Sequence, residues 1–261
     1  MNPKITYAIT VCNEAWELDN LLQKLIKFVQ PNDQILIQSD SDNVTEDVEA
    51  VIDKFIQHYR SSSVEMKYIS TSLDGDFSKF KNNLKLNSTG DWIFQLDADE
   101  YPTDSLFTAL LYVLKNNEHV DVILVPRINT VNGITQAHIT EWGWKYSFVY
   151  HPLLQTTASV TGMDNDALQF LRESGAVYED DGATIYYNQP VINFPDYQWR
   201  LYKNKPNIQW INKVHERLIG FDSYATLPAD ISWCIMHEKE IQRQEYQNKF
   251  YDEITKYGLD Y

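Results

Sequence analysis

The chain is 261 residues long and carries 37 acidic against 22 basic side chains, which gives a formal net charge of −15. This length allows one large domain with a substantial core, and no Gly-, Pro- or Ser-rich tract divides the chain. The strong negative charge argues against a nucleic-acid surface, because such surfaces take most of their affinity from clustered lysine and arginine.

Strand and helix patterns alternate through the first half of the chain. Short apolar runs predict strands at residues 5–11, 35–37, 64–69, 92–96 and 120–125. Apolar side chains at helical spacing predict helices at residues 18–29, 44–59, 77–86 and 106–114. This order predicts a mostly parallel sheet with helices on both faces, an α/β scaffold of the nucleotide-binding type.

The strand predicted at residues 92–96 ends in a group of carboxylates. Asp97, Ala98, Asp99 and Glu100 follow it directly, before Pro102 ends the strand pairing. In an open α/β sheet, ligands bind beyond such carboxyl ends. Hard oxygen ligands favour Mg²⁺ or Mn²⁺, which is commonly held by one or two carboxylates together with substrate phosphates. Asp97 and Asp99 are therefore candidate metal ligands, although a short D-x-D motif also occurs in turns and helix caps.

The region after residue 132 has a different character. Asn132 and Gly133 form a hairpin-turn signal. Alternating aromatic side chains then predict a strand with all its rings on one face, at Trp142, Trp144, Tyr146, Phe148 and Tyr150. This aromatic stripe is either buried core or a platform on which sugar rings stack. The acidic stretch at residues 164–181 is expected to be a solvated lid or insertion.

A final helix is predicted at residues 240–257, with Gly258 as its stop. Aromatic and aliphatic side chains at helical spacing give it an apolar face. Two roles stay open for this helix, docking on the body of the protein and self-association into a homo-oligomer.

The cysteines and the N-terminal segment bear on the compartment. Cys12 and Cys234 form no C-x-x-C pair, so they indicate neither a zinc ribbon nor a disulfide framework. The N-terminus lacks a signal-peptide pattern, and no apolar run approaches about 18 residues. We therefore expect a cytoplasmic protein without a transmembrane segment, with peripheral contact to a membrane left open.

Four sequence segments together point to a known family. They are ITYAITVCNEAWELDNLL, DFSKFKNNL, GDWIFQLDADE, and the distal pair FPDYQWRLYKN and IQWINKVHE. In these segments the chain resembles inverting family-two glycosyltransferases of the A-type fold, especially the bacterial group related to lipopolysaccharide-core glucosyltransferases. The resemblance covers most of residues 1–132 and 193–240.

The resemblance implies an α/β fold of the GT-A type, with a mostly parallel central sheet and helices on both faces. We expect a single glycosyltransferase domain over residues 1–261. Residues 1–132 would form its nucleotide-binding half, and residues 133–192 an inserted acceptor-side region or lid. Residues 193–261 would form the acceptor-side half and the C-terminal helix.

The resemblance also assigns donor-binding residues. The loop that packs against the donor nucleotide corresponds to residues 10–14, with Thr10, Cys12, Asn13 and Glu14 as its candidate contacts. Asp97 matches a ribose or metal contact, Ala98 continues that segment, and Asp99 matches the direct metal ligand. Lys81 stands where the family commonly has arginine near the base or phosphate, and the two are not interchangeable at bidentate sites. Gln38 replaces the usual aspartate against the base, with Asp40 displaced beyond it.

Catalysis by such an enzyme needs a general base for the acceptor hydroxyl and charge relief on the departing diphosphate. The resemblance makes Glu216 the candidate base, and the alternative is an exposed carboxylate paired with Lys213 or Arg217. Arg200 is a candidate clamp for phosphate or for the loop that carries the base, with a structural ion pair as the alternative. His237 matches a metal or diphosphate contact, with a structural core histidine as the alternative.

The expected function is that of a metal-dependent inverting glycosyltransferase that uses Mn²⁺ or Mg²⁺. It would move a sugar from a nucleoside-diphosphate sugar to a hydroxyl of a glycan or glycoconjugate acceptor. A UDP-sugar is the first expected donor, with GDP- and dTDP-sugars as alternatives. Two other classes stay open, a sugar nucleotidyltransferase and a non-catalytic carbohydrate-binding protein. The former usually has a Gly-rich basic loop after the first strand, which VCNEAWEL is not.

Overall fold

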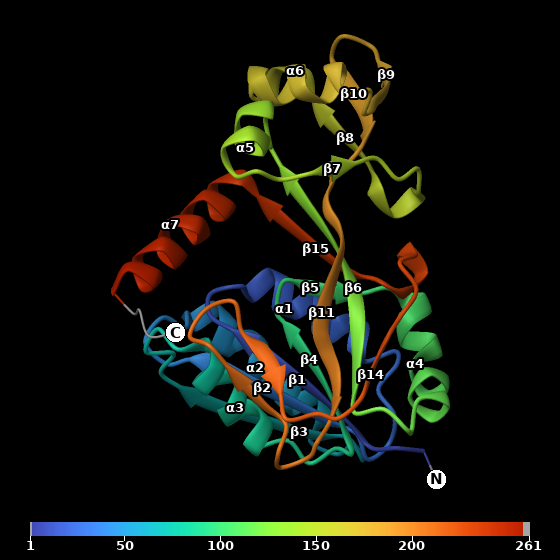
Figure 1. Ribbon diagram of the computed structural model, residues 1–261, viewed down its shortest axis with the longest axis vertical. Helices are drawn as coiled ribbons and strands as arrows, with labels where there is room; N and C mark the ends of the chain where they lie inside the picture. Colours follow the sequence, from blue (N-terminus) through green and yellow to red (C-terminus); the bar gives the residue numbers. More distant parts are fainter. Residues whose placement is uncertain (1, 258–261) are drawn as a thin grey trace. The chain divides into compact units, whose positions relative to one another are not determined.

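The computed structural model describes residues 2–257 and divides the chain into two compact units (Figure 1). Unit 1 contains the chain up to Pro126, the segment Tyr197–Ile235 and the end of the C-terminal helix. Unit 2 contains Arg127–Asp196 and Met236–Glu253. The chain crosses from one unit to the other within strands and within a helix, so neither unit is one continuous segment.

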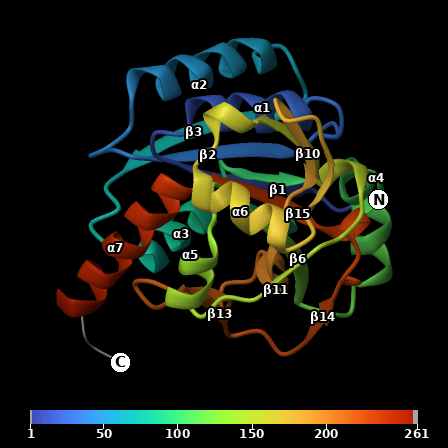
Figure 2. The same cartoon turned by 90° about the horizontal axis from the view of Figure 1, so that it is seen from above.

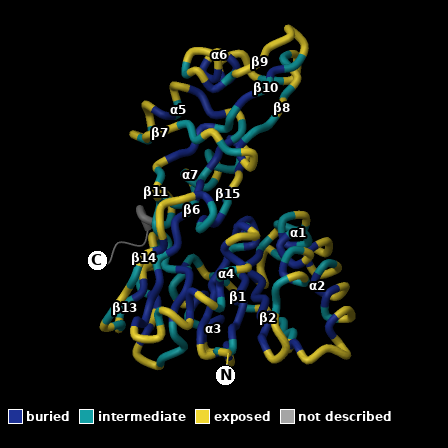
Figure 3. The backbone as a smooth tube through the Cα atoms, turned by 90° about the vertical axis from the view of Figure 1, so that its right-hand side faces the viewer, coloured by how far each residue is buried: buried dark blue, intermediate teal, exposed yellow. Residues whose placement is uncertain are grey.

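Unit 1 is built on a sheet whose first strands are parallel. They lie in the order β3 (Glu65–Thr71), β2 (Gln34–Asp40), β1 (Ile5–Val11) and β4 (Trp92–Asp97). The sheet continues with β11 (Val191–Lys203), antiparallel to β4, then β6 (Val122–Asn132), with β14 (Tyr224–Thr226) parallel to β6. Every residue of β2 is buried, as expected for a strand covered on both faces (Figure 3).

Helices cover both faces of this sheet. They are α1 (Ala15–Leu25), α2 (Glu46–Tyr59), α3 (Phe77–Leu86) and α4 (Asp104–Asn116). Successive residues of a strand point to opposite faces. Tyr7 and Ile9 therefore pack in the core that contains α1, α2 and α4, whereas Ala8 packs in the core that contains Leu84 of α3. Figure 2 shows α1 and α2 on one side of the strands and α3 on the other.

Short polar side chains fix where the helices begin. The Thr45 hydroxyl accepts a hydrogen bond from the backbone of Val48 at the start of α2, and Asp76 accepts one from Lys79 at the start of α3. Such N-caps each contribute about 1 kcal/mol, because they satisfy backbone N–H groups that the helix leaves unpaired. The short strands β12 (Gln209–Ile211) and β13 (Arg217–Ile219) form a hairpin, and β12 contacts α3.

The elements predicted for the first half are confirmed, with shifted ends. The predicted strand at 35–37 extends to Gln34–Asp40, because the polar residues at its ends are buried and hydrogen bonded. One example is Gln34, whose Oε1 accepts from the Thr6 hydroxyl at 2.8 Å. The predicted strand at 120–125 begins at Val122 and runs on to Asn132. The first helix ends at Leu25, four residues before the predicted end at 29, ahead of Pro31.

Unit 2 has its own small sheet and its own core. Its elements are α5 (Gln136–Glu141), β7 (Tyr146–Ser147), η1 (Pro152–Leu154), β8 (Gln155–Ser159), η2 (Val160–Gly162), α6 (Asn165–Glu173), β9 (Val177–Asp180) and β10 (Thr184–Asn188). Antiparallel pairing gives the strand order β8-β10-β9. The unit also takes in parts of β6, β11, β15 (Ile235–Glu240) and α7 (Ile241–Tyr257).

Two predictions for this region are wrong. Residues 142–150 do not form one strand, since Trp142 caps α5 and only Tyr146 and Ser147 are extended and paired. The aromatic side chains are divided accordingly, with Trp142 packed against the core of unit 2 and Tyr150 exposed. Gly133 adopts a positive φ of 79° and makes a turn, but a helix follows it, so there is no hairpin. Within the acidic stretch, α6 is amphipathic and buries Leu168 and Phe170.

The predicted C-terminal helix is confirmed as Ile241–Tyr257, and its predicted stop, Gly258, lies outside the described residues. Among residues 2–257, no helix is both long enough and apolar enough to cross a bilayer. The β15 strand leads directly into this helix.

We expect Gly90→Ala to destabilise the protein by about 1–3 kcal/mol, the usual cost of overpacking. A Cβ atom there would lie 2.5 Å from the backbone nitrogen of Thr6 and 2.7 Å from the carbonyl oxygen of Trp92, and neither can move without shifting the strands. The urea midpoint of unfolding measures the loss. Gly162→Ala is the matched control, because its Cβ meets only the Ser159 Cβ, at 3.9 Å. Equal losses in both variants would contradict the packing argument.

Candidate active site

Three of the predicted site residues meet at the carboxyl edge of the sheet in unit 1. The parallel register places Thr10 of β1 opposite Gln38 of β2 on one side and opposite Asp97 of β4 on the other. Thr10 therefore lies at the centre of the edge at which ligands bind in open α/β sheets. The strand pairing alone brings together residues that are far apart in the sequence.

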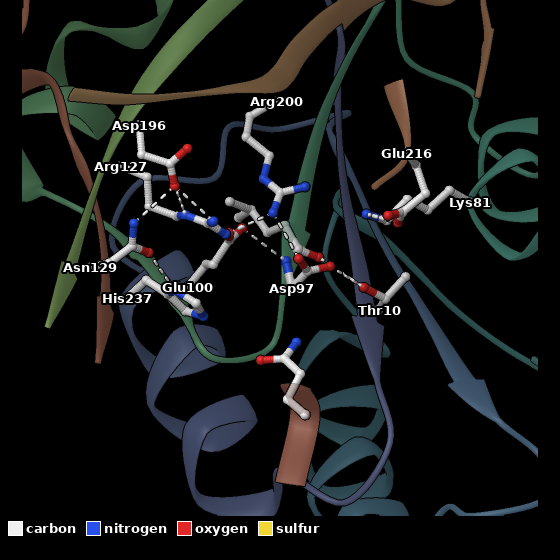
Figure 4. Close-up of polar contacts among 12 residues, drawn as sticks. Thr10, Lys81, Asp97, Glu100, Arg127, Asn129, Asp196, Arg200, Glu216 and His237 are labelled. Atoms are coloured by element: carbon white, nitrogen blue, oxygen red, sulfur yellow. Dashed lines mark hydrogen bonds and ion pairs between the residues drawn. The ribbon is translucent and has the colours of Figure 1, made fainter. Parts of the chain in front are cut away.

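Both carboxylate oxygens of Asp97 are engaged (Figure 4). Its Oδ1 accepts a hydrogen bond from the Thr10 hydroxyl at 2.6 Å, and its Oδ2 accepts one from Nη2 of Arg200 at 2.7 Å. Its backbone N–H donates to Oε2 of Glu100 at 3.2 Å. These contacts hold the Asp97 side chain in one orientation at the end of β4.

Arg200 is the centre of a buried ion-pair network. Its side chain is 3% exposed, and Nη2 contacts both Asp97 and Oε1 of Glu100, the latter at 2.5 Å. Glu100 begins the short strand β5 (Glu100–Pro102) and is fully buried. Burial alone would lower the pKa of Arg200, but the charges of Asp97 and Glu100, with a further contribution from Glu216, raise this pKa above its ordinary value. The guanidinium is therefore a permanent positive charge at this edge.

The candidate base, Glu216, forms a second ion pair, with the buried Lys81. Its Oε1 lies 2.7 Å from Nζ of Lys81, and the two side chains are 14% and 9% exposed. The Lys81 ammonium also lies 5.0 Å from the centre of the Trp210 ring, a cation–π distance. Neither Lys213 nor Arg217, the partners considered from the sequence, is the residue in this ion pair. His215, just before Glu216, has a positive φ of 53°, which is uncommon outside glycine.

The loop after β1 is organised by Glu14. Its Oε2 accepts hydrogen bonds from the backbone N–H groups of Cys12 and Asn13, at 2.7 and 3.0 Å. Ala98 is buried, and its N–H donates to the Thr10 carbonyl at 2.9 Å. The two predicted donor-binding segments are thus joined by a backbone hydrogen bond.

The polar groups of Gln38 and Asp40 are used in hydrogen bonds to nearby residues of the protein. The amide of Gln38 donates to the Phe80 carbonyl at 2.8 Å and accepts from Nδ2 of Asn83 at 2.9 Å. Oδ1 of Asp40 accepts from the backbone of Leu73 at 3.0 Å, and Oδ2 accepts from Asn43 at 2.7 Å. Both side chains are buried, and they shape the loops at the end of β2.

His237 lies in unit 2, on β15, and is 9% exposed. Its Nδ1 is 2.7 Å from Oδ1 of Asn129. Asp196, also in unit 2, pairs with Arg127 at 2.8 Å. This histidine therefore belongs to a polar network of strands β6, β11 and β15.

The carboxylates at the end of β4 are of the ligand type that Mg²⁺ and Mn²⁺ prefer. Asp97 and Asp99 supply hard carboxylate oxygens, and Asp99 is 8% exposed. Among residues 2–257, no group of three or more His, Cys, Asp or Glu side chains is placed to hold a metal by itself. Mg²⁺ and Mn²⁺ complete their coordination with water and substrate phosphates. The two aspartates therefore fit a cation that binds together with a diphosphate.

Glu100 is the site residue for which sequence reasoning found no role. It follows the two aspartates directly, yet it is fully buried and accepts hydrogen bonds from Arg200 and from the Asp97 backbone. The available signal was its position before Tyr101 and Pro102 in a second short strand. A charged residue in a buried strand requires a partner, and Arg200 provides it.

Comparison with known proteins gives one family. A family model described as "Glycosyl transferase family 2" matches residues 6–174, which is more than half of the chain. No curated protein matches the sequence. The mostly parallel sheet with helices on both faces is that of the A-type glycosyltransferase fold, as predicted.

The solved structures that match this chain are distant from it in sequence. S. aureus TarS is 14% identical, with 98% of this chain and 40% of that chain covered and a TM-score of 0.49. Its 1–349 form in complex with UDP is 14% identical, with 98% and 67% covered and a TM-score of 0.47. The mannosyltransferase PcManGT from Pyrobaculum calidifontis, in complex with GDP-Man and Mn²⁺, is 15% identical, with 72% and 45% covered and a TM-score of 0.37. The chain thus spans less than half the length of the first of these structures.

We expect Arg200→Met to destabilise unit 1 by about 3–5 kcal/mol, because it leaves the buried Glu100 carboxylate without its cation. The urea midpoint and circular dichroism of the purified variant measure this. Arg172→Met is the matched control, since Arg172 pairs with Asp180 on an exposed surface at 2.6 Å and exposed pairs contribute little. A loss in Arg172→Met as large as that in Arg200→Met would show that burial of the pair is not the cause.

Proposed function

This chain belongs to glycosyl transferase family 2, and we propose that it transfers a sugar, with inversion, from a nucleoside-diphosphate sugar to a hydroxyl of a glycan or glycoconjugate. The observation that carries this proposal is the sheet edge of unit 1. Thr10, Asp97 and Arg200 are joined there by direct contacts, and the charge of Glu216 acts on Arg200. The aspartate at the end of β4 and the candidate base thus both interact electrostatically with the buried guanidinium of Arg200.

The donor nucleotide would lie over the carboxyl ends of β1, β2 and β4. Thr10, Cys12, Asn13, Gln38 and Asp97 come from these strand ends and the loop after β1. We propose a UDP-sugar as the first donor, with GDP- and dTDP-sugars as alternatives. Gln38 and Asp40 already hydrogen bond to neighbouring parts of the protein. The nucleobase of the donor would therefore be recognised chiefly by residues that surround these two side chains.

Asp99, with Asp97 beside it, would hold a Mn²⁺ or Mg²⁺ ion that binds with the donor. When bound, this ion supplies positive charge to the leaving diphosphate. Asp97 is already oriented by Thr10 and Arg200, so its carboxylate needs little rearrangement before the ion binds. Such preorganisation reduces the cost of assembling the site.

Glu216 would act as the general base. Its Oε1 is held 2.7 Å from Nζ of Lys81, and its carboxylate would accept the proton of the acceptor hydroxyl. The acceptor oxygen would attack the anomeric carbon from the side opposite the diphosphate, in a single displacement through an oxocarbenium-like state. Lys81 stands where the family places a base or phosphate contact, but in this protein it is paired with Glu216, so we propose that it orients the base.

The loop after β1 argues against a nucleotidyltransferase. The N–H groups of Cys12 and Asn13 are occupied by the carboxylate of Glu14. A Gly-rich loop that binds a triphosphate needs such N–H groups for the phosphate oxygens. Sugar transfer from a diphosphate donor does not require this loop to bind a phosphate.

Incubation with Mn²⁺ and a panel of nucleotide sugars is expected to release nucleoside diphosphate, slowly even when water is the acceptor. Chelation by EDTA should stop the release, and added Mn²⁺ should restore it. Liquid chromatography of the nucleotides measures both effects. Pyrophosphate release from a nucleoside triphosphate would support a nucleotidyltransferase instead. Neither turnover nor nucleotide binding across the panel would refute the proposal.

Asp99→Asn and Glu216→Gln should separate binding from catalysis. We expect Asp99→Asn to abolish Mn²⁺-dependent binding of the donor nucleotide, measured by calorimetry. Glu216→Gln should bind normally but lose about 10²–10⁴-fold in transfer rate, the usual contribution of a general base. Asp53→Asn, an exposed residue on α2, is the control and should change neither quantity. Equal loss of binding in Asp99→Asn and Glu216→Gln would contradict the assigned roles.

A further inference from the structure

The candidate base, Glu216, lies in a mostly exposed loop. This loop joins β12 to β13 at residues 212–216, and Asn212, Lys213 and His215 in it are exposed. Asn212 and His215 have positive φ angles of 72° and 53°, a conformation that is uncommon outside glycine. Such a loop keeps one conformation only where its surroundings fix it. The contacts that the hairpin makes with the rest of unit 1 therefore decide where Glu216 lies.

Helix α3 contacts this hairpin along its first two turns. The backbone N–H of Phe77 donates to the Lys213 carbonyl at 3.0 Å. Lys81 lies one helical turn further along α3, on the same side of the helix, and its Nζ pairs with Glu216 at 2.7 Å (Figure 4). The next residue of α3, Asn82, makes a third kind of contact, with the backbone of the hairpin.

The Asn82 side chain binds both backbone groups of Trp210. Its Nδ2 donates to the Trp210 carbonyl at 2.8 Å, and its Oδ1 accepts from the Trp210 N–H at 2.9 Å. Trp210 is the residue of β12 that lies opposite Leu218 of β13. Asn82 thus supplies, on the α3 side of β12, hydrogen bonds of the kind that a neighbouring strand would supply. Because both bonds come from one planar carboxamide, they fix the distance and the orientation of the hairpin relative to α3.

The Trp210 side chain is fixed as well. It is 3% exposed, its Nε1 donates to the Tyr202 hydroxyl at 3.3 Å, and this hydroxyl donates to Oε1 of Gln95 at 3.3 Å. Tyr202 and Gln95 lie on β11 and β4, inside the sheet. The Lys81 ammonium lies 5.0 Å from the centre of the Trp210 ring. Trp210 is therefore held by the sheet through its side chain and by α3 through its backbone.

We propose that Asn82 is a positioning residue for the general base, because its two bonds to Trp210 hold the hairpin where Glu216 can reach the acceptor hydroxyl. This inference rests on the proposed function, since it gives Asn82 a part in the step that Glu216 performs. A general base acts only within hydrogen-bond distance of the proton that it removes. A displacement of about 1 Å can lower a reaction rate about 10²-fold. Asn82 acts on the reaction through the hairpin and not through contact with the acceptor.

Steady-state kinetics of Asn82→Ala test the positioning role. The assay uses Mn²⁺ and the nucleotide sugar that the wild type hydrolyses in the panel above, with water as the acceptor. We expect kcat to fall about 10²-fold. The KM for the nucleotide sugar should stay unchanged, because the proposed donor contacts come from the ends of β1, β2 and β4. Asn82→Asp, which accepts from the Trp210 N–H but cannot donate to the carbonyl, preserves the size of the side chain and should also lower kcat.

A double-mutant cycle with Glu216→Gln separates positioning of the base from a general loss of structure. Once the base is absent, its position no longer affects the rate. Asn82→Ala in the Glu216→Gln background should therefore cause no further loss, measured in single-turnover reactions at high enzyme concentration. A general structural defect would lower the rate by the same factor in both backgrounds. Losses that multiply in this way would overturn the proposal.

Asn87→Ala is the matched control. Asn87 lies at the C-terminal end of α3 and also donates and accepts through its side chain. Its Nδ2 donates to the Asn83 carbonyl at 3.0 Å, and its Oδ1 accepts from Nζ of Lys67 at 2.8 Å. This substitution removes comparable hydrogen bonds from the same helix but leaves the hairpin contact intact, so kcat should stay at the wild-type value. An equal fall in kcat in Asn82→Ala and Asn87→Ala would overturn the assignment.

Hydrogen exchange followed by mass spectrometry tests the contact itself, on the protein without substrate. We expect residues 209–219 to exchange faster in Asn82→Ala than in the wild type, and at the wild-type rate in Asn87→Ala. Circular dichroism reports whether each variant is folded. Unchanged exchange of residues 209–219 in Asn82→Ala would overturn the proposal. A wild type that hydrolyses no nucleotide sugar would refute the proposed function, and the exchange rates would then report separately whether Asn82 holds the hairpin.

Discussion

The interaction on which the site of unit 1 depends is the buried pairing of Arg200 with Asp97 and Glu100. Glu100 is fully buried, and a carboxylate in that position is tolerated only with a cation against it. Arg200 satisfies this requirement from β11, while Asp97 and Glu100 lie on β4 and β5. The Arg200 side chain therefore connects the last parallel strand, β4, to the antiparallel strand β11. It also holds Asp97 in its orientation at the end of β4.

The candidate base, Glu216, is also held by an ion pair with a basic side chain. Lys81 comes from α3 on one face of the sheet, and Glu216 comes from the loop before β13, whose hairpin partner β12 contacts α3. The packing of the hairpin on α3 therefore delivers Glu216 to Lys81. Both carboxylates with assigned roles, Asp97 and Glu216, are oriented by a buried basic residue rather than by solvent. Neither is free to rotate as an exposed side chain would be.

The sequence predicts the strands of unit 1 well, because strands buried on both faces are continuous apolar runs. It misses the ends of β2, where Gln34 and Asp40 are buried through hydrogen bonds and not through hydrophobicity. The aromatic residues of unit 2 alternate like a strand, but a helix cap and a loop divide them. The pairing of Lys81 with Glu216 could not be read from the sequence, since it depends on tertiary packing between residues 135 positions apart.

The balance of charge at the sheet edge explains why a cation belongs in the proposed mechanism. Asp97, Glu100 and Glu216 are paired with only two basic residues, Arg200 and Lys81, and Asp99 adds a further carboxylate beside them. These named residues leave the edge two charges negative, in a protein that is itself acidic. A diphosphate approaching this edge is repelled unless positive charge arrives with it. In the proposed mechanism, a divalent ion bound by Asp97 and Asp99 would supply two positive charges, because Arg200 and Lys81 are already paired with carboxylates.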